Sequence, residues 1–326
     1  MTAIGGDQIG LGVIGAGIMG GRMLHAALGH ATESVRIVGV WDPSADALAR
    51  IGAELPTVAH FDSVAALIAA ADCVYIASPP ASHLALAGQA LAAGKAAFCE
   101  KPLASDVAAA AAFVAAHSGA RAAVNFPMAT SFSAERIRAW LNDGAVGSPS
   151  SLEIDVAFAN WPRGWQMAAA SWLDGRAEGG FTREVVSHFL FLTHRLFGAL
   201  SLLESTVEFP VDHRSERRLA ASLTAGGLPV TLSGAIGTTP KDDHNTWTLT
   251  GDRGAIRLRD WAFAERLVEG EWQPDPEALP NERARPLVLK RQLAGVADLT
   301  RGKEHPLATL SEAFAVQRAV EAILGG

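Results

Sequence analysis

A glycine-rich turn after the first apolar segment constrains the fold more than any other feature of the chain. The sequence GVIGAGIMGG places Gly15, Gly17 and Gly20 in the spacing G-x-G-x-x-G, between an expected strand over 10–14 and an expected helix over 18–29. The first glycine of such a turn permits a tight bend, the second lets the backbone approach a diphosphate, and the third allows close helix–strand packing. The spacing alone is also compatible with an ordinary strand-to-helix turn, so its context matters.

The context favours a dinucleotide site. The next expected strand, over 35–41, ends at Asp42, about 20 residues after Gly20, where a ribose-binding acid is found in such sites. A carboxylate there accepts a hydrogen bond from the adenosine 2′-hydroxyl and repels a 2′-phosphate, and no Arg or Lys is among the next three residues. We therefore expect NAD as the cofactor, with NADP less favoured. The residues expected to contact its phosphates at the helix start are Gly15, Gly17, Ile18, Met19 and Gly20.

Short apolar segments alternate with alanine-rich helical stretches over the first 125 residues. Further strands are expected over 57–60, 73–77, 96–99 and 121–125, and further helices over 45–53, 62–70, 82–93 and 104–117. Helix N-caps are expected at Asp62, Ser82 and Ser105. This alternation predicts an α/β fold: residues 1–125 form a Rossmann dinucleotide-binding domain with a doubly wound parallel sheet and helices on both faces.

After residue 126 the pattern changes. Helices are expected over 134–142, 181–197, 286–301 and 309–324, a long strand over 150–159, and alternating strands between 199 and 268. The proline-rich stretch over 274–286 is expected to be a loop. Residues 126–326 are therefore predicted to form a C-terminal α+β domain with a large, mostly antiparallel open sheet that helices cover on one face.

Composition narrows the classes of partner. The chain is 49% hydrophobic and 19% charged, which excludes a mostly disordered protein, and its net charge of -7 argues against nucleic acid and anionic membranes. The only cysteines, Cys73 and Cys99, lie in apolar stretches, which favours a reducing cytoplasm. The N-terminus lacks the features of a signal peptide, and no apolar run is long enough to cross a bilayer. No metal-binding motif occurs, so a metal is not expected.

Three further motifs stand out, two of them directly after expected strands and one in the second half of the chain. Ser78-Pro79-Pro80-Ala81-Ser82-His83 comes after the strand over 73–77, and Glu100-Lys101-Pro102 after the strand over 96–99. The stretch GGFTREVVSHFLF covers residues 179–191. With the glycine turn, these motifs resemble those of the glucose–fructose oxidoreductase / inositol dehydrogenase / rhizopine-catabolism (Gfo/Idh/MocA) family, and the resemblance extends over essentially the whole chain.

The resemblance implies hydride transfer between nicotinamide and a secondary alcohol or carbonyl, commonly on a sugar, a polyol or a derivative. It implies an open sheet in the second domain that often mediates oligomer contacts, so a homodimer or homotetramer is expected. Cofactor contacts are implied for Ser78, Pro79, His83, Glu100 and Lys101. Catalytic roles are implied for Lys101, His188 and Glu184, although Glu184 stands where the family usually has Asp. Val186 and Phe191 also depart from the family pattern, and the segment VNFPMATSF lacks an Arg that is usual there. Because of these departures, the resemblance does not identify the substrate.

Lys101 would lie at the carboxyl end of a parallel strand, the edge at which doubly wound folds bind ligands. Removing a hydride from an alcohol needs a base for the hydroxyl proton, and the reverse reaction needs an acid. A lysine near a nicotinamide cation would have its ammonium form disfavoured; as ammonium it would instead polarise a carbonyl. The alternative is an ordinary surface lysine in the turn before Pro102.

Glu184 and His188 are four residues apart and would share one face of an α-helix that is apolar nearly all round. A buried carboxylate and a buried imidazole need partners. Either the two form a structural pair, or they face a cleft that substrate and Lys101 complete. We favour the second arrangement, with His188 as proton donor or acceptor and Glu184 orienting or charging the Lys101–His188 set. Lys101 and His188 would then converge beside one nicotinamide ring.

Substrate contacts are expected from polar and aromatic residues outside the cofactor motifs. Indole faces stack on the C–H surfaces of sugars, and Asn and Arg bind hydroxyls or a carboxylate. The alternatives are that the tryptophans pack their loop onto the domain, and that Arg183 pairs with Glu184. The expected substrate-binding residues are Asn125, Asn160, Trp161, Arg163, Trp165 and Arg183.

The leading hypothesis is an NAD-dependent dehydrogenase that acts on a sugar-like or polyol substrate. The same site would support imine reduction, or redox-assisted lyase or glycosidase chemistry. A third hypothesis is a non-catalytic dinucleotide sensor built on the same fold. The presence of both Lys101 and His188 argues against a sensor, which has no need for proton transfer.

Overall fold

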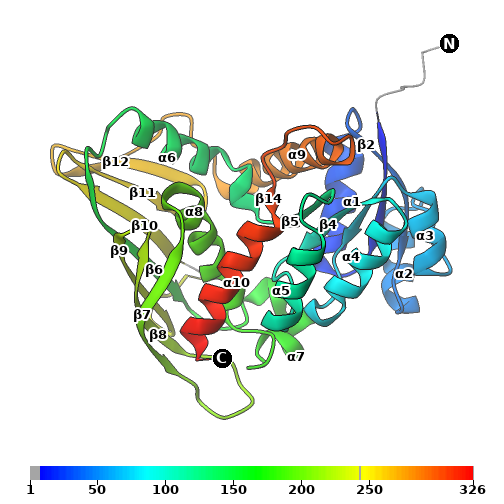
Figure 1. The fold of residues 1–326 in the computed structure, drawn as a ribbon, viewed down its shortest axis with the longest axis horizontal. Coiled ribbons are helices and arrows are strands. Elements are labelled where there is room, and N and C mark those ends of the chain that lie inside the picture. The colour runs from blue at the N-terminus through cyan, green and yellow to red at the C-terminus, as the bar shows by residue number, and fades with distance from the viewer. Residues whose placement is uncertain (1–7, 242–243, 326) are drawn as a thin grey trace. The chain divides into compact units, whose positions relative to one another are not determined.

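A computed structural model describes residues 8–241 and 244–325 (Figure 1). The first seven residues, for which no signal peptide is predicted, lie outside this part. Contacts divide the chain into two compact units, one of Met1–Thr130 with Arg285–Ala313 and one of Ser131–Ala284 with Phe314–Gly326. The predicted domains, 1–125 and 126–326, stay a prediction, and the contacts add residues 285–313 to the first unit.

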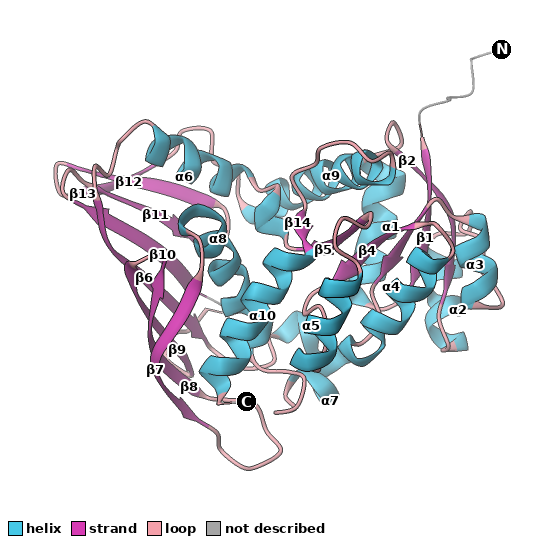
Figure 2. Ribbon diagram, in the orientation of Figure 1, coloured by secondary structure: helices cyan, strands magenta, loops and turns pink. Residues whose placement is uncertain are grey.

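The first unit is built on a six-stranded sheet, and the predicted doubly wound parallel sheet is confirmed. Its strands are β1 (Ile9–Ile14), β2 (Val35–Trp41), β3 (Cys73–Ile76), β4 (Ala96–Glu100), β5 (Ala122–Asn125) and β14 (Ala308–Thr309). The spatial order is β14-β5-β4-β3-β1-β2, and only the short β14 is antiparallel to its neighbour. β1, β3, β4 and β5 are buried along their full length, because helices cover both faces of the sheet (Figure 2).

The helices of the first unit lie close to their predicted positions. They are α1 (Ile18–His30), α2 (Ala45–Glu54), α3 (Val64–Ala70), α4 (His83–Ala92), α5 (Val107–Ala116) and, from residue 285 onward, α9 (Asn281–Thr300). Leu293 and Val296 of α9 join Met23 and Leu24 of α1 in one core. This contact explains why a late segment of the chain belongs to the early unit.

Three local expectations in the first unit are wrong. No strand forms over 57–60, where His60 makes only an isolated bridge to Val40. Two N-caps lie one residue later than expected. Ser63 caps α3 and Asp106 caps α5, each accepting a backbone N–H three residues on. Ser82 is in the N-cap position of α4 as expected, but its hydroxyl bonds the Pro79 carbonyl rather than the helix.

The second unit contains the predicted open sheet, which has eight strands. They are β6 (Pro149–Phe158), β7 (Leu200–Glu208), β8 (Arg218–Ala225), β9 (Leu228–Ile236), β10 (His244–Gly251), β11 (Ala255–Arg259), β12 (Phe263–Val268) and β13 (Glu271–Pro274). The order is β13-β12-β11-β10-β6-β9-β8-β7, and every neighbouring pair is antiparallel except β6 and β9. Buried and open residues alternate along the central strands, so one face is covered and the other is not.

Helices of the second unit pack on the covered face (Figure 1). They are α6 (Phe132–Asn142), α8 (Ser187–Phe197) and the later part of α10 (Leu310–Leu324). The short α7 (Ala170–Leu173) also belongs to the second unit and follows the loop after β6. Trp247 of β10 is fully buried against α8, where its indole Nε1 donates to the Thr193 hydroxyl at 2.9 Å.

Two expectations about helices in the later part of the chain are corrected. The predicted helix over 181–197 is interrupted, because Thr182–Val186 forms a turn of π-helix before α8 begins. At the start of this turn, the buried Glu216 carboxylate accepts both the backbone N–H and the hydroxyl of Thr182 at 2.7 Å. In addition, the proline-rich stretch is only partly a loop, since α9 begins at Asn281 and contains Pro286.

The shifted N-cap gives a test of the local structure. Asp106→Ala should destabilise the protein by about 1 kcal/mol, because the Ala109 N–H at the start of α5 loses its acceptor. Ser105→Ala, one residue earlier, is the matched control and should leave the thermal melting midpoint unchanged. Equal losses in the two variants would contradict the cap assignment.

Candidate active site

The glycine turn between β1 and α1 fits a bound dinucleotide. Gly15 has φ of 102°, and a Cβ on it would lie 2.6 Å from the Ala77 carbonyl oxygen. A Cβ on Gly20 would lie 1.8 Å from the Gly15 carbonyl oxygen, so this packing needs glycine. At Gly17 an added Cβ would meet nothing within 4 Å, and no side chain caps α1 there. The open position at Gly17 and the uncapped helix start are what a diphosphate needs.

Asp42 is joined to this turn. Its carboxylate accepts the Ala16 N–H at 2.7 Å and the Ser44 N–H at 2.8 Å, one bond on each oxygen. A carboxylate has about four lone-pair sites, so capacity remains for a ribose hydroxyl. Arg50 of α2, which sequence reasoning did not single out, donates to the Ala16 carbonyl and lies 3.4 Å from Glu54. Its guanidinium is thus engaged within the protein.

His83 connects the loops that follow β3 and β4. It is 1% exposed, and its two ring nitrogens lie 2.7 Å from the Ser78 carbonyl oxygen and 2.8 Å from the Pro102 carbonyl oxygen. A neutral imidazole carries a single N–H, so only one of these contacts is a hydrogen bond in that form. Burial lowers the pKa of His83, and the positive charge of Lys101 lowers it further. The two carbonyl oxygens act in the opposite direction, because they favour the protonated form.

These contacts bring most of the predicted cofactor residues together along one edge of the sheet. Asp42 reaches the glycine turn, Gly15 packs against the start of the Ser78–Pro79 segment, and His83 joins Ser78 to Pro102. Lys101 lies between Glu100 and Pro102 at the end of β4 and is partly buried. The sequence therefore identified a continuous row of loops at the carboxyl ends of parallel strands, where such folds bind ligands.

Asn125, expected to bind substrate, lies inside the first unit. It is 1% exposed, and its amide nitrogen donates to the Glu100 carboxylate at 2.7 Å. Its side chain thus supports Glu100 from inside the first unit. The phenol of Tyr75, missed by sequence reasoning, donates to the same carboxylate oxygen. Its one visible signal was a lone polar aromatic residue within an apolar strand.

In the second unit, the backbone does not follow the α-helical spacing assumed for Glu184 and His188. Glu184 lies in the π-helical turn and is partly exposed, whereas His188 lies in α8 and is buried. The π-helical turn ends at Val186, before His188, and the shared face of Glu184 and His188 stays a prediction.

Trp261 is a neighbour of His188 that sequence reasoning missed. The two rings meet edge to face with centroids 5.4 Å apart, and the indole also packs against Phe189 at 5.1 Å. Trp261 has φ of 70°, which is unusual for a bulky residue, and Ser133 Oγ donates to its carbonyl at 2.8 Å. Such strained positions cluster at functional sites, although the only sequence signal was an aromatic residue just after a strand.

The tryptophan-rich loop after β6 contains one indole that packs onto the domain and one that is open to a ligand. Trp161 is 8% exposed, donates its Nε1–H to the Leu173 carbonyl and packs edge-on against Phe158, so it anchors the loop. Trp165 is 42% exposed, with the Arg163 guanidinium 4.8 Å from its ring centre. Arg163 is itself buried and donates to Gln166. Asn160 is exposed. Trp165 is therefore the indole of this loop that is open to a ligand.

The carboxylate partner of Arg183 is Glu321 rather than Glu184. The role of Arg183 in substrate binding stays a prediction. Its Nε and Nη2 bind the two oxygens of Glu321 at 2.7 and 2.6 Å, and its Nη1 donates to the Arg176 and Gly179 carbonyls. A guanidinium engaged on all three nitrogens in this way joins the π-helical turn to α10 and is better assigned to structure than to substrate.

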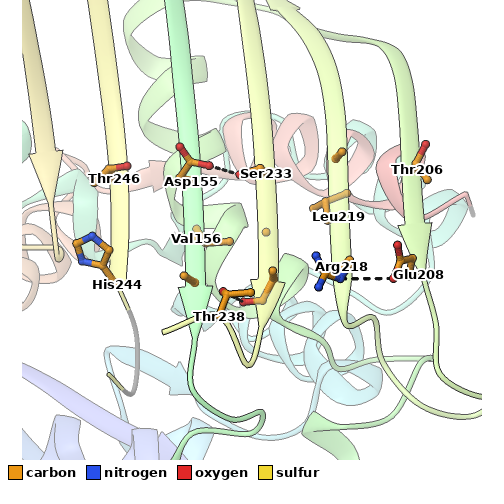
Figure 3. Close-up of a pocket in the computed structure, with 14 residues that line it drawn as sticks. Asp155, Val156, Thr206, Glu208, Arg218, Leu219, Ser233, Thr238, His244 and Thr246 are labelled. Atoms are coloured by element: carbon orange, nitrogen blue, oxygen red, sulfur yellow. Dashed lines mark hydrogen bonds and ion pairs between the residues drawn. The ribbon is translucent and has the colours of Figure 1, made fainter. Parts of the chain in front are cut away.

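The open face of the eight-stranded sheet carries a shallow pocket of about 580 Å³ (Figure 3). Asp155 on β6 accepts a hydrogen bond from Ser233 on β9 within it, and Arg218 pairs with Glu208 at its edge. The neighbouring charge of Asp155, followed by burial, raises the pKa of Glu153 on the same strand. Acidic side chains are thus concentrated on β6.

Comparison with protein families identifies the first part of the chain. Residues 9–126 match the Gfo/Idh/MocA family, described as an oxidoreductase family with an NAD-binding Rossmann fold. The resemblance predicted from the motifs is confirmed for this part of the chain. No curated protein matches the sequence.

Solved structures extend the similarity in fold to the whole chain. An oxidoreductase from Thermotoga maritima has a TM-score of 0.82 at 17% identity, covering 98% of this chain and 96% of that one. An oxidoreductase from Agrobacterium radiobacter in complex with NAD+, L-tartaric acid and magnesium has a TM-score of 0.80 at 20% identity, covering 96% and 94%. Apo scyllo-inositol dehydrogenase from Lactobacillus casei has a TM-score of 0.78 at 17% identity, covering 99% and 96%. Among the described residues, no helix is both long and apolar enough to span a membrane.

The buried His83 predicts an acid-sensitive stability. Because its pKa is lowered in the folded state, the unfolded chain binds more protons between that lowered pKa and about 6.5, so stability should fall as the pH falls through this window. His83→Gln should cost about 1 kcal/mol at neutral pH and should lose less stability on acidification. Thermal melting between neutral and mildly acidic pH measures both effects. His30→Gln, at an exposed position, is the control, and an identical acid dependence in His83→Gln and the unaltered protein would refute this role.

The structural assignment of Arg183 is also testable. Arg183→Lys should destabilise the protein by about 3 kcal/mol, since a lysine cannot replace the paired bonds to Glu321. A double-mutant cycle with Glu321→Gln should show strong coupling, while Arg318→Lys, an exposed position on α10, should change little. An unchanged melting midpoint in Arg183→Lys would return Arg183 to the candidates for substrate binding.

Proposed function

We propose that this protein is an NAD-dependent dehydrogenase or reductase that transfers a hydride between nicotinamide and a secondary alcohol or carbonyl of a sugar, a polyol or a related small molecule. The observation that carries the proposal is the row of hydrogen-bonded loops from Asp42 through the glycine turn to His83 and Pro102. It is supported by the similarity in fold to structures described as a scyllo-inositol dehydrogenase and as an oxidoreductase in complex with NAD+ and L-tartaric acid.

NAD is proposed over NADP. The Asp42 carboxylate stands where it would repel a 2′-phosphate and accept a ribose hydroxyl. The nearby cation, Arg50, is held by the Ala16 carbonyl and lies beside Glu54. The residues proposed to hold the cofactor are Gly15, Gly17, Ile18, Met19, Gly20, Asp42, Ser78, Pro79, His83, Glu100 and Lys101.

Proton transfer is proposed for Lys101 and His188, which come from the two different units of the chain. When bound, nicotinamide supplies the hydride acceptor or donor. Lys101 accepts the hydroxyl proton of an alcohol through its amine, or returns that proton to an alkoxide. His188 acts as a second proton donor or acceptor, and its ring orientation is supported by Trp261. Glu184 is proposed to contribute charge to this set.

A homo-oligomer formed through the open sheet is part of the proposal. On that face, Glu153 and Asp155 of β6 lie two strands from Arg257 and Arg259 of β11 in the sheet register. A second copy related by a two-fold axis would set such opposite charges against each other. A cytoplasmic location and the absence of nucleic-acid and membrane partners stay predictions.

The test uses the purified protein with NAD+ and a panel of polyols, sugars and sugar acids, with NADH absorbance as the signal. At least one member should be oxidised. Lys101→Met should then lower kcat by about 10²- to 10⁴-fold, with a much smaller change in NAD+ affinity, because the lysine moves a proton rather than holding phosphate. Lys303→Met, at an exposed position, is the matched control.

Two results would argue against the proposal. Equal losses of turnover and of NAD+ affinity in Lys101→Met would contradict the role of its amine. Tight NAD+ binding without oxidation or reduction of any substrate in the panel would favour a dinucleotide sensor.

A further inference from the structure

Four polar side chains form a connected network inside the first unit. Tyr75 on β3, Glu100 on β4, Asn125 on β5 and Gln292 on α9 are 0%, 7%, 1% and 0% exposed. Tyr75 and Asn125 both contact Oε1 of Glu100, and Gln292 contacts Asn125. A buried carboxylate at the end of a strand is costly unless such partners stabilise it.

The hydrogen bonds of this network all point toward Glu100. A carboxylate only accepts, so Asn125 presents its amide N–H₂ to Glu100 and turns its carbonyl oxygen toward Gln292. Gln292 must then donate to that oxygen. Donors arranged in series polarise one another and strengthen the final bond. The network therefore stabilises the negatively charged form of Glu100.

Tyr75 acts in the same direction. Its pKa is raised well above its usual value, mainly by burial and further by the charge of Glu100, so the phenol keeps its proton. A protonated phenol next to a carboxylate donates a charge-assisted hydrogen bond. Tyr75 is the single tyrosine of the chain, which makes it a clean spectroscopic reporter of this network.

The strand order indicates which half of a dinucleotide this charge faces. Asp42 follows β2 and the glycine turn follows β1, so the adenosine and diphosphate lie over these two strands. β3, β4 and β5 continue the sheet on the other side of β1. The nicotinamide half is therefore expected beyond β1, on the side where β4 ends in Glu100 and where His83 bonds the Pro102 carbonyl.

We propose that Glu100, held by Tyr75, Asn125 and Gln292, makes the site favour the oxidised over the reduced dinucleotide. The nicotinamide ring carries a positive charge in NAD+ and none in NADH, so a fixed carboxylate stabilises the first more than the second. Tyr75, Asn125 and Gln292 are positioning residues that act through Glu100. The inference rests on the proposed function only in requiring that the protein binds NAD.

When it is protonated, the neighbouring amine of Lys101 disfavours the positively charged ring of NAD+. This effect is opposite to that of the Glu100 carboxylate. The ratio of affinities in the unaltered protein thus reflects both groups. The change in that ratio on neutralising Glu100 isolates the carboxylate, and this change is the quantity to measure.

The experiment measures the dissociation constants of NAD+ and NADH separately, by calorimetry, for the unaltered protein and for Glu100→Gln. The amide has the shape of the carboxylate without its charge. The ratio Kd(NAD+)/Kd(NADH) should rise about tenfold, which corresponds to about 1.4 kcal/mol. Tyr75→Phe, which removes only the hydroxyl, should shift the ratio in the same direction by a smaller factor. Cys99→Ala, a buried neutral position on the same strand, is the control and should not move it.

A second measurement needs no stable Glu100 variant. In protein labelled with ¹³C at the tyrosine ring, the single Tyr75 signal should shift differently on addition of NAD+ and of NADH. Binding of both nucleotides with an unchanged affinity ratio in Glu100→Gln and Tyr75→Phe would overturn this inference alone. Failure of the unaltered protein to bind either nucleotide would overturn the proposed function as well.

Discussion

The contact between Gly20 and the Gly15 carbonyl is the constraint on which the first unit depends. A single added carbon at Gly20 would lie 1.8 Å from that oxygen, so α1 can start where it does only because no side chain is present. This close packing sets the start of α1 beside the end of β1 and leaves Gly17 open. Asp42 then accepts the Ala16 N–H, and the Ala77 carbonyl lies against Gly15. The loops after β2 and β3 are thus both held against the glycine turn.

In both units, hydrogen bonds from several donors stabilise the buried carboxylates. Glu100 accepts from a phenol and an amide, Glu216 from the backbone and hydroxyl of Thr182, and Glu321 from two nitrogens of Arg183. Only the last of these has a full countercharge among its bonds described here. Carboxylates stabilised in this way hold defined positions, because leaving one of their donors or acceptors unpaired inside the protein is expensive.

The two units use their polar interiors differently. In the first, the network around Glu100 lies at the ends of strands, next to the loops that the family match assigns to an NAD-binding fold. In the second, Glu216 and the Arg183–Glu321 pair shape the approach to α8, which carries His188. The π-helical turn before α8 begins at Thr182, which Glu216 binds, and π-helical turns occur often at functional sites.

By itself the sequence determined the features that depend on neighbours along the chain. The glycine turn, the acid after β2 and the alternation of strands and helices are local patterns, and they predicted the Rossmann sheet and its cofactor loops. Only the tertiary structure decided the partners of Asn125, Arg183 and Tyr75, because these lie on segments far apart in the sequence. It also decided that residues 57–60 form no strand and that Trp261 lies beside His188. A side chain's type shows what it can bind, whereas its position among distant residues decides which partner satisfies it.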